Sequence, residues 1–186
     1  MTNEARPEPK TIVINLFSGP GAGKSTSMAG IFHELKCLDV NCEMGHEFAK
    51  EKIWDESYAV LRDQVYVFAK QLHSLRRLEG KVEVIVTDSP IVLSLIYAKN
   101  EPPEFKAFAL AVNKRFRSMN FFLHRNKKFN PSGRIHSKEE SETIDEKIRN
   151  LLDESGIAYE EVPADKKSVK IIVKKIMKEL EKNGKA

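Results

Sequence analysis

The chain has 186 residues, of which 41% are hydrophobic and 31% charged, and its formal net charge is +4. This length and composition favour a globular protein with a full core and exclude a disordered chain. No apolar run approaches the length needed to span a bilayer, so we expect no membrane partner. The mild positive charge does not by itself indicate a nucleic-acid partner.

The first residues, 1–10, are polar, contain two prolines and lack the apolar core of a secretory signal. We expect a flexible tail there and a single domain over residues 11–183. Cys37 and Cys42 have neither metal-ligand nor redox spacing. Two reduced thiols are typical of a cytoplasmic protein.

An apolar strand is predicted over residues 11–16 and a helix over 27–36, with a glycine-rich turn between them. In such a turn the backbone N–H groups point into one concavity, and the helix dipole adds positive potential. The pattern is typical of a triphosphate-binding loop, or P-loop, in which Lys24 reaches the β- and γ-phosphates and the Ser25 hydroxyl contacts Mg²⁺. Ser18 stands where the motif usually has its first glycine.

The predicted nucleotide-binding residues are Gly19, Gly21, Ala22, Gly23, Lys24, Ser25 and Thr26. The expected cofactors are ATP and Mg²⁺; ATP rather than GTP is an assumption, because the guanine-recognition motif is absent.

Further strands and helices alternate along the rest of the chain. Apolar spacing, glycine and proline positions predict a strand over 40–44, a short helix over 47–54, a long helix over 58–79, a strand over 81–88 and a helix over 91–98. They then predict a helix over 104–118, a strand over 119–123, a loop over 126–137, a helix over 137–154 begun by a Ser137/Glu140 capping box, a strand over 157–162 and a helix over 165–182. Regular alternation implies an α/β fold of three layers, with a five-stranded parallel sheet and helices on both faces.

Ligands of such sheets collect at the carboxyl ends of the strands. Asp88 ends the most apolar strand, as a Walker B aspartate does, and is predicted to hold Mg²⁺ or to orient the acceptor. Glu47, just after the second strand, is predicted to receive the proton of an acceptor hydroxyl. Glu43 is a weaker candidate, and Glu47 has a second interpretation as a helix-starting carboxylate. Whether Glu47 or Asp88 is the base stays open.

The basic loop at about residues 126–137 has the composition of a mobile lid over the transferring phosphoryl group. Arg125 and Arg134 are its predicted catalytic residues, because a guanidinium can hold two phosphate oxygens. A merely solvated basic loop is the alternative. For the acceptor, Gln64 offers a donor and an acceptor to a base edge, and Trp54 offers a stacking surface.

Four segments together resemble a known family. They are the P-loop Ser18–Thr26, the run Glu47–Glu51, the run Leu61–Gln64, and Thr87–Pro90 after the third strand. The pattern resembles P-loop small-molecule kinases typified by the nicotinamide riboside kinase domain of bifunctional NAD-biosynthesis proteins. The resemblance covers roughly residues 11–173 in order of elements, although only the P-loop is highly specific.

The run after the third strand is also similar to the Asp/Glu-Arg-Ser motif of deoxynucleoside kinases, with Ser89 where an arginine often stands. The resemblance implies that a carboxylate after the second strand handles the acceptor hydroxyl, which supports Glu47, and that a glutamine of the long helix contacts the base, which supports Gln64. Similar proteins occur in bacteriophages, including kinases that phosphorylate hydroxymethyl-uracil within DNA.

Three functions are therefore carried forward. The first is a kinase of a free nucleoside, nucleotide or related metabolite, and the second a kinase of a modified base in DNA. The third is an ATP-driven switch. A compact monomer or homodimer is more typical of a phosphotransferase than of a motor-type ATPase. The kinase of a free small molecule is therefore preferred.

Overall fold

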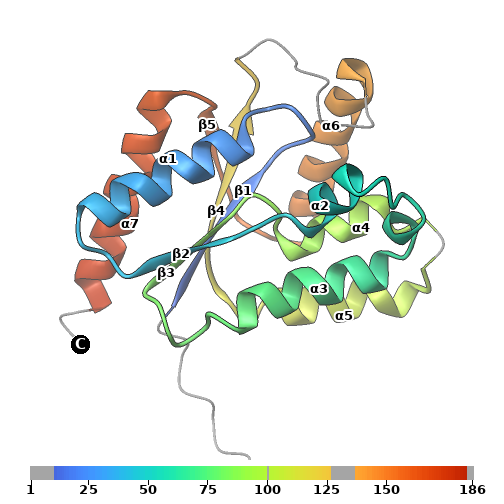
Figure 1. Cartoon of the computed structure of the whole chain (residues 1–186), viewed down its shortest axis with the longest axis horizontal. Helices are drawn as coiled ribbons and strands as arrows, with labels where there is room; N and C mark the ends of the chain where they lie inside the picture. Colours follow the sequence, from blue (N-terminus) through green and yellow to red (C-terminus); the bar gives the residue numbers. More distant parts are fainter. Residues whose placement is uncertain (1–10, 100, 127–136, 184–186) are drawn as a thin grey trace, which may run out of the picture.

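The structure is a computed structural model that describes residues 11–99, 101–126 and 137–183 (Figure 1). Its described strands form one parallel sheet in the order β2-β3-β1-β4-β5. The strands are β1 (Ile12–Phe17), β2 (Cys42–Gly45), β3 (Val84–Thr87), β4 (Arg117–His124) and β5 (Glu160–Pro163). The predicted five-stranded parallel sheet is confirmed.

Helices cover both faces of the sheet. In Figure 1, α1 (Lys24–Cys37) and α7 (Lys166–Asn183) lie together on one side. The other side carries α3 (Gln64–Arg76), α4 (Ser94–Tyr97), α5 (Pro103–Asn113) and α6 (Lys138–Glu154). Three short pieces complete the described helices: α2 (Phe48–Trp54) and the 3₁₀ turns η1 (Val60–Arg62) and η2 (Ile91–Leu93). None of the helices in the described ranges is both long enough and apolar enough to cross a bilayer.

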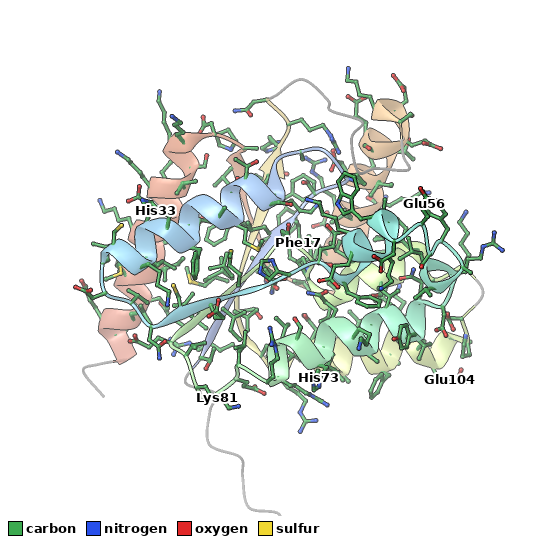
Figure 2. All side chains as sticks on the ribbon, in the orientation of Figure 1. Phe17, His33, Glu56, His73, Lys81 and Glu104 are labelled. Carbon is green, nitrogen blue, oxygen red and sulfur yellow. The ribbon has the colours of Figure 1, made fainter. Side chains whose placement is uncertain are left out.

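The central strand β1 shows why both faces need a cover. Its side chains alternate between two cores, with Ile12, Ile14 and Leu16 on the α1/α7 side and Val13 and Phe17 on the other. All of β1 is buried. Figure 2 shows side chains filling both spaces between sheet and helices, with Phe17 in the interior. The strand is therefore a fixed support for the loop that follows it.

The predicted long helix over 58–79 is shorter than expected. Asp63 interrupts it, because its side chain accepts a hydrogen bond from the Tyr66 N–H and so caps the start of α3 at Gln64. The preceding residues form the 3₁₀ turn η1. The local preference of aspartate for a capping position outweighs the apolar periodicity that continues through it. As a result, Gln64 lies in the first turn of α3 and not in mid-helix.

Helix α6 begins with the predicted capping box. The Ser137 Oγ accepts from the Glu140 N–H at 3.1 Å, and the Glu140 carboxylate accepts from the Ser137 N–H at 2.6 Å. Residues 127–136 of the predicted lid, including Arg134, lie outside the described residues. The helix predicted over 104–118 ends at Asn113, and β4 starts at Arg117, two residues earlier than predicted.

Candidate active site

The glycine-rich loop turns sharply between β1 and α1. Gly21 and Gly23 have φ angles of 79° and 105°, which residues with a Cβ rarely adopt. Gly23 is the N-cap of α1, and its carbonyl accepts from the Ser27 N–H at 2.9 Å. The N-terminus of α1 therefore points at the loop concavity, as an anion site requires.

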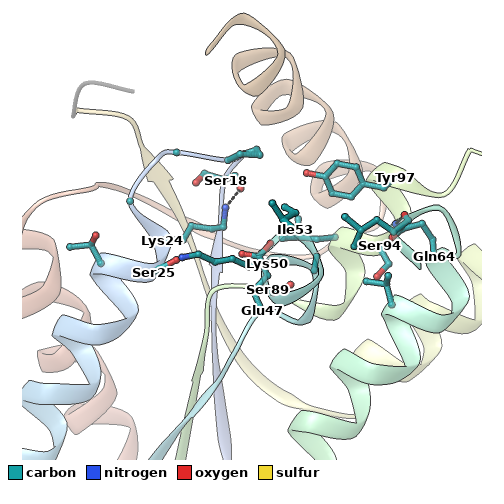
Figure 3. Close-up of a pocket in the computed structure, with 18 residues that line it drawn as sticks. Ser18, Lys24, Ser25, Glu47, Lys50, Ile53, Gln64, Ser89, Ser94 and Tyr97 are labelled. Atoms are coloured by element: carbon teal, nitrogen blue, oxygen red, sulfur yellow. Dashed lines mark hydrogen bonds between the residues drawn. The ribbon is translucent and has the colours of Figure 1, made fainter. Parts of the chain in front are cut away.

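The Lys24 ammonium is held by the loop itself. It donates to the Ser18 carbonyl at 2.7 Å and to the Gly19 carbonyl at 3.1 Å (Figure 3). Desolvation lowers the pKa of Lys24, although the negative charges of Glu47, Asp88 and Asp145 oppose this effect. When a nucleotide binds, its phosphate oxygens would replace the two carbonyls as hydrogen-bond acceptors of the ammonium.

Asp88 follows β3 and is 2% exposed. Its Oδ1 is buried without a hydrogen-bond partner. A buried carboxylate oxygen that lacks a partner is costly, so it fits a site completed by a cation or its water. No three His, Cys, Asp or Glu side chains of the described residues gather into a metal cage. A single carboxylate, together with a hydroxyl such as that of Ser25, fits Mg²⁺, which binds through few protein ligands plus phosphates and waters.

A cavity of about 320 Å³ opens directly beside the P-loop. Figure 3 shows Ser18 and Lys24 on one side of it and Gln64 and Tyr97 on the other. Glu47 also lines this cavity. The arrangement joins a phosphate-binding loop to a space large enough for a small organic group.

Of the two candidate carboxylates near β2, the structure places one at the cavity. Glu47 is the N-cap residue of α2 and lines the cavity together with Ser89. Glu43 lies within β2, where its carboxylate accepts from the Met44 N–H, and it is not a lining residue. Geometry therefore favours Glu47 over Glu43 as the residue that meets an acceptor.

The two glutamines of α3 have different surroundings. Gln71 is engaged with the Phe48 N–H at 3.3 Å and the Thr87 Oγ1 at 3.4 Å, so it ties α3 to α2 and β3. Gln64 lines the cavity, is 5% exposed and donates to the Leu61 carbonyl at 2.6 Å. Its Oε1 is buried without a hydrogen-bond partner. This oxygen is left to accept a hydrogen bond from a ligand.

Tyr97 is a cavity residue that the sequence reasoning did not identify. It ends α4, and burial raises the pKa of its hydroxyl, with Glu47 and Asp145 adding to the effect. The phenol therefore stays protonated and can donate a hydrogen bond. A helix over residues 91–98, after Asp88, was predicted from the sequence. No local pattern, however, distinguished Tyr97 from an aromatic residue of the core.

Trp54 lies at the end of α2 with 63% of its surface exposed, and it is not among the residues that line the cavity. Its neighbour Ile53 does line the cavity. The role predicted for Trp54 in acceptor binding stays a prediction, and the structure gives it a place outside the cavity.

Arg125 lies behind the P-loop and does not line the cavity. Its Nη1 donates to the Pro20 carbonyl at 2.6 Å, its Nη2 to the Ser141 carbonyl at 3.0 Å, and its Nε to Asp145 at 2.8 Å. The sequence reasoning found Arg125 but missed Asp145, which lies on α6 and reaches the loop only through tertiary packing. The predicted contact of Arg125 with the phosphoryl group stays a prediction.

These features define a P-loop nucleotide-binding protein with the three-layer α/β fold of small kinases. The sequence matches the family model described as “AAA domain” over residues 13–170, and the chain belongs to that family. A search of curated proteins finds no match.

The solved structures that are similar to this one include two kinases. Deoxyadenosine kinase from M. mycoides with bound dATP has a TM-score of 0.54 and 18% sequence identity, over 91% of this chain and 99% of that chain. Shikimate kinase from Bacteroides thetaiotaomicron has a TM-score of 0.46 and 15% identity, over 91% of this chain and 98% of that chain. The first likeness shows a shared fold.

Proposed function

We propose that this protein is a Mg²⁺-dependent phosphotransferase that moves the γ-phosphate of ATP to a nucleoside, nucleotide or related small molecule. One observation supports this most directly: the cavity beside the P-loop is lined by both Lys24 and Glu47. The same space thus has a cation for the phosphates and a carboxylate for the acceptor. A nucleotide-driven switch can use such a carboxylate to activate water, but it needs no cavity for a second molecule beside the phosphates.

In the proposed reaction, Lys24 leaves the Ser18 and Gly19 carbonyls for the β- and γ-phosphates. Ser25 and Asp88 would hold Mg²⁺, which neutralises charge on the phosphates when bound. Glu47 accepts the proton of the acceptor hydroxyl as that oxygen attacks the γ-phosphorus and the β–γ bridging bond breaks. We assign this step to Glu47 because it lines the cavity, whereas Asp88 does not.

Gln64 supports an acceptor that carries a nitrogen heterocycle. Its buried Oε1 suits a ring N–H, and the Tyr97 hydroxyl can donate to an acceptor oxygen. The similarity in fold to deoxyadenosine kinase adds support for a nucleoside-type acceptor. A cytoplasmic location and a monomeric or homodimeric state remain part of the proposal.

A second candidate function is the same transfer to a modified base in DNA. It is favoured by one exposed aromatic residue: Trp54 is 63% exposed and directly follows Ile53, which lines the cavity together with Lys50. Aromatic side chains beside a cation can stack on bases that flank an extruded nucleotide. The acceptor group would enter the same cavity in both cases.

The test is transfer of γ-labelled phosphate from ATP, with Mg²⁺, to a panel of nucleosides, nucleoside monophosphates, and DNA oligonucleotides with hydroxymethyl-uracil. Label on a free nucleoside or nucleotide supports the first candidate, and label on DNA alone supports the second. Lys24→Ala should lower transfer at least ~100-fold, because a P-loop cation is lost. Lys36→Ala, an exposed lysine on the same helix, is the matched control. ATP hydrolysis that no acceptor stimulates would refute the proposal.

A further inference from the structure

The peptide group between Ser18 and Gly19 connects the catalytic lysine to helix α6. Its carbonyl accepts from the Lys24 ammonium at 2.7 Å, and its N–H donates to the Asp145 carboxylate. The C=O and N–H of a trans peptide point in opposite directions, so the two partners hold the same plane from opposite sides. Any rotation of this plane moves the carbonyl that positions Lys24.

Arg125 also binds the loop and helix α6. Its guanidinium is bound at once to Asp145, to the Pro20 carbonyl and to the Ser141 carbonyl of α6. Asp145 is 8% exposed, and the ion pair is largely shielded from water. A shielded, hydrogen-bonded pair fixes geometry better than a surface pair does.

The packing around Gly19 leaves no room for a side chain. A Cβ added at Gly19 would lie 2.4 Å from the Ser141 carbonyl, 2.8 Å from the Arg125 Nη2 and 3.2 Å from the Asp145 Oδ1. The loop thus lies directly against α6 and the end of β4. Its first residues are held by these two elements as well as by β1.

We propose that Asp145 and Arg125 are positioning residues that orient the Ser18–Gly19 peptide and thereby place Lys24 for the nucleotide phosphates. The inference rests on the nucleotide-binding part of the proposed function. It gives Arg125 a role in the site through the loop and not through contact with the phosphoryl group. It also assigns a role to Asp145, which lies outside the P-loop motif.

A double substitution provides a readout that a purely structural role would not move. If Asp145 acts on nucleotide binding through the Ser18–Gly19 peptide and Lys24, it contributes nothing once the Lys24 ammonium is removed. Asp145→Asn should therefore weaken nucleotide binding in the natural chain but add no further loss in a Lys24→Ala chain.

The experiment measures the Kd of a non-hydrolysable ATP analogue with Mg²⁺, by calorimetry at neutral pH, on the full chain with and without Lys24→Ala. Asp145→Asn is compared with Glu146→Gln, which neutralises the exposed carboxylate next to it on α6. We expect Asp145→Asn to bind at least ten times more weakly, with its circular dichroism unchanged, and to cause no further weakening in the Lys24→Ala chain. Glu146→Gln should match the natural protein.

Arg125→Lys is the second variant, and it also serves if Asp145→Asn does not fold. A lysine can pair with Asp145 but cannot hold the Pro20 and Ser141 carbonyls as well. Weaker nucleotide binding by a folded Arg125→Lys protein is expected. The inference is overturned if the folded variants bind within twofold of Glu146→Gln, or if Asp145→Asn weakens binding as much in the Lys24→Ala chain as in the natural one. If the natural protein itself bound no nucleotide, the proposed function would fail and this inference with it.

Discussion

At the scale of single residues, the site contains polar groups whose hydrogen bonding is incomplete or exchangeable. The Oδ1 of Asp88 and the Oε1 of Gln64 are buried without a hydrogen-bond partner, and Lys24 is bound to carbonyls of its own loop. Folding alone gains little from such arrangements, because an unpaired buried polar atom costs stability. Gln64 and Lys24 line the cavity, and Asp88 directly precedes the lining residue Ser89, so these incompletely paired groups gather where the proposed ligands bind.

The lowered pKa of Lys24 predicts how nucleotide binding depends on pH. The protonated amine is the form that attracts phosphate, and desolvation makes the proton leave below the ordinary value of 10.5. ATP affinity should therefore be constant near neutral pH and fall as the pH rises through the lowered pKa. Calorimetry at increasing pH, in buffers of different ionisation enthalpy, should also detect proton uptake on binding in that range. An affinity that stays constant up to pH 10.5 would contradict this prediction.

Gln64→Leu should separate binding from stability. The substitution removes the unpaired Oε1 and the hydrogen bond to the Leu61 carbonyl, so the two stability effects oppose each other and their sum should stay within about 1 kcal/mol. The KM for the acceptor should rise roughly tenfold, because a ligand N–H loses its partner. The KM for ATP should not change. Steady-state kinetics with both substrates varied, alongside urea unfolding, would check this, and an unchanged acceptor KM would exclude the role of Gln64.

At the scale of helices and strands, local signals gave the element types and the order, and tertiary packing set several lengths. The capping box at Ser137 and Glu140 was readable because it is formed by four consecutive residues. The break at Asp63 was missed, since apolar periodicity continues across it and only the cap shows where α3 begins. β4 was predicted too short because its first residues, from Arg117, are only half-buried.

The capping box can be tested directly. Ser137→Ala removes the acceptor for the Glu140 N–H and should lower the free energy of unfolding by about 1 kcal/mol. Thr143→Ala, at an exposed position of the same helix, should change it by less than about 0.5 kcal/mol. Urea denaturation of both variants gives the comparison. Equal losses would mean that the box contributes nothing specific.

At the scale of the whole molecule, the sheet separates two cores that have different tasks. The α1/α7 core supports the helix that follows the P-loop, and the other core supports α3 and the segment after β3, which both contribute residues to the cavity. The rule that ligands gather at the carboxyl ends of parallel strands brought Glu47, Asp88 and the P-loop together from sequence alone. It could not identify Tyr97 or Asp145, because their contribution depends on how helices pack around the loop.

Ile176→Ala tests the first of these cores. Ile176 of α7 is fully buried, so its truncation should cost about 2–5 kcal/mol in the free energy of unfolding. The folded fraction should keep its KM for ATP, because the residue lies away from the cavity. Ile171→Ala on the same helix, where 44% of the side chain is exposed, is the control and should cost far less. A loss of ATP affinity in folded Ile176→Ala would show that the two cores are coupled through the P-loop.

The position of Trp54 makes intrinsic tryptophan fluorescence a probe of ligand binding near the cavity. It is the only tryptophan of the chain, and its exposed indole follows directly on Ile53, which lines the cavity. Fluorescence excited at the indole band therefore originates from one known point of α2. A molecule that binds in the cavity next to Ile53 and contacts Trp54 would shift or quench the emission. A nucleotide confined to the P-loop would leave it nearly unchanged. Titrating unlabelled protein with candidate acceptors would thus sort them before any phosphate is transferred.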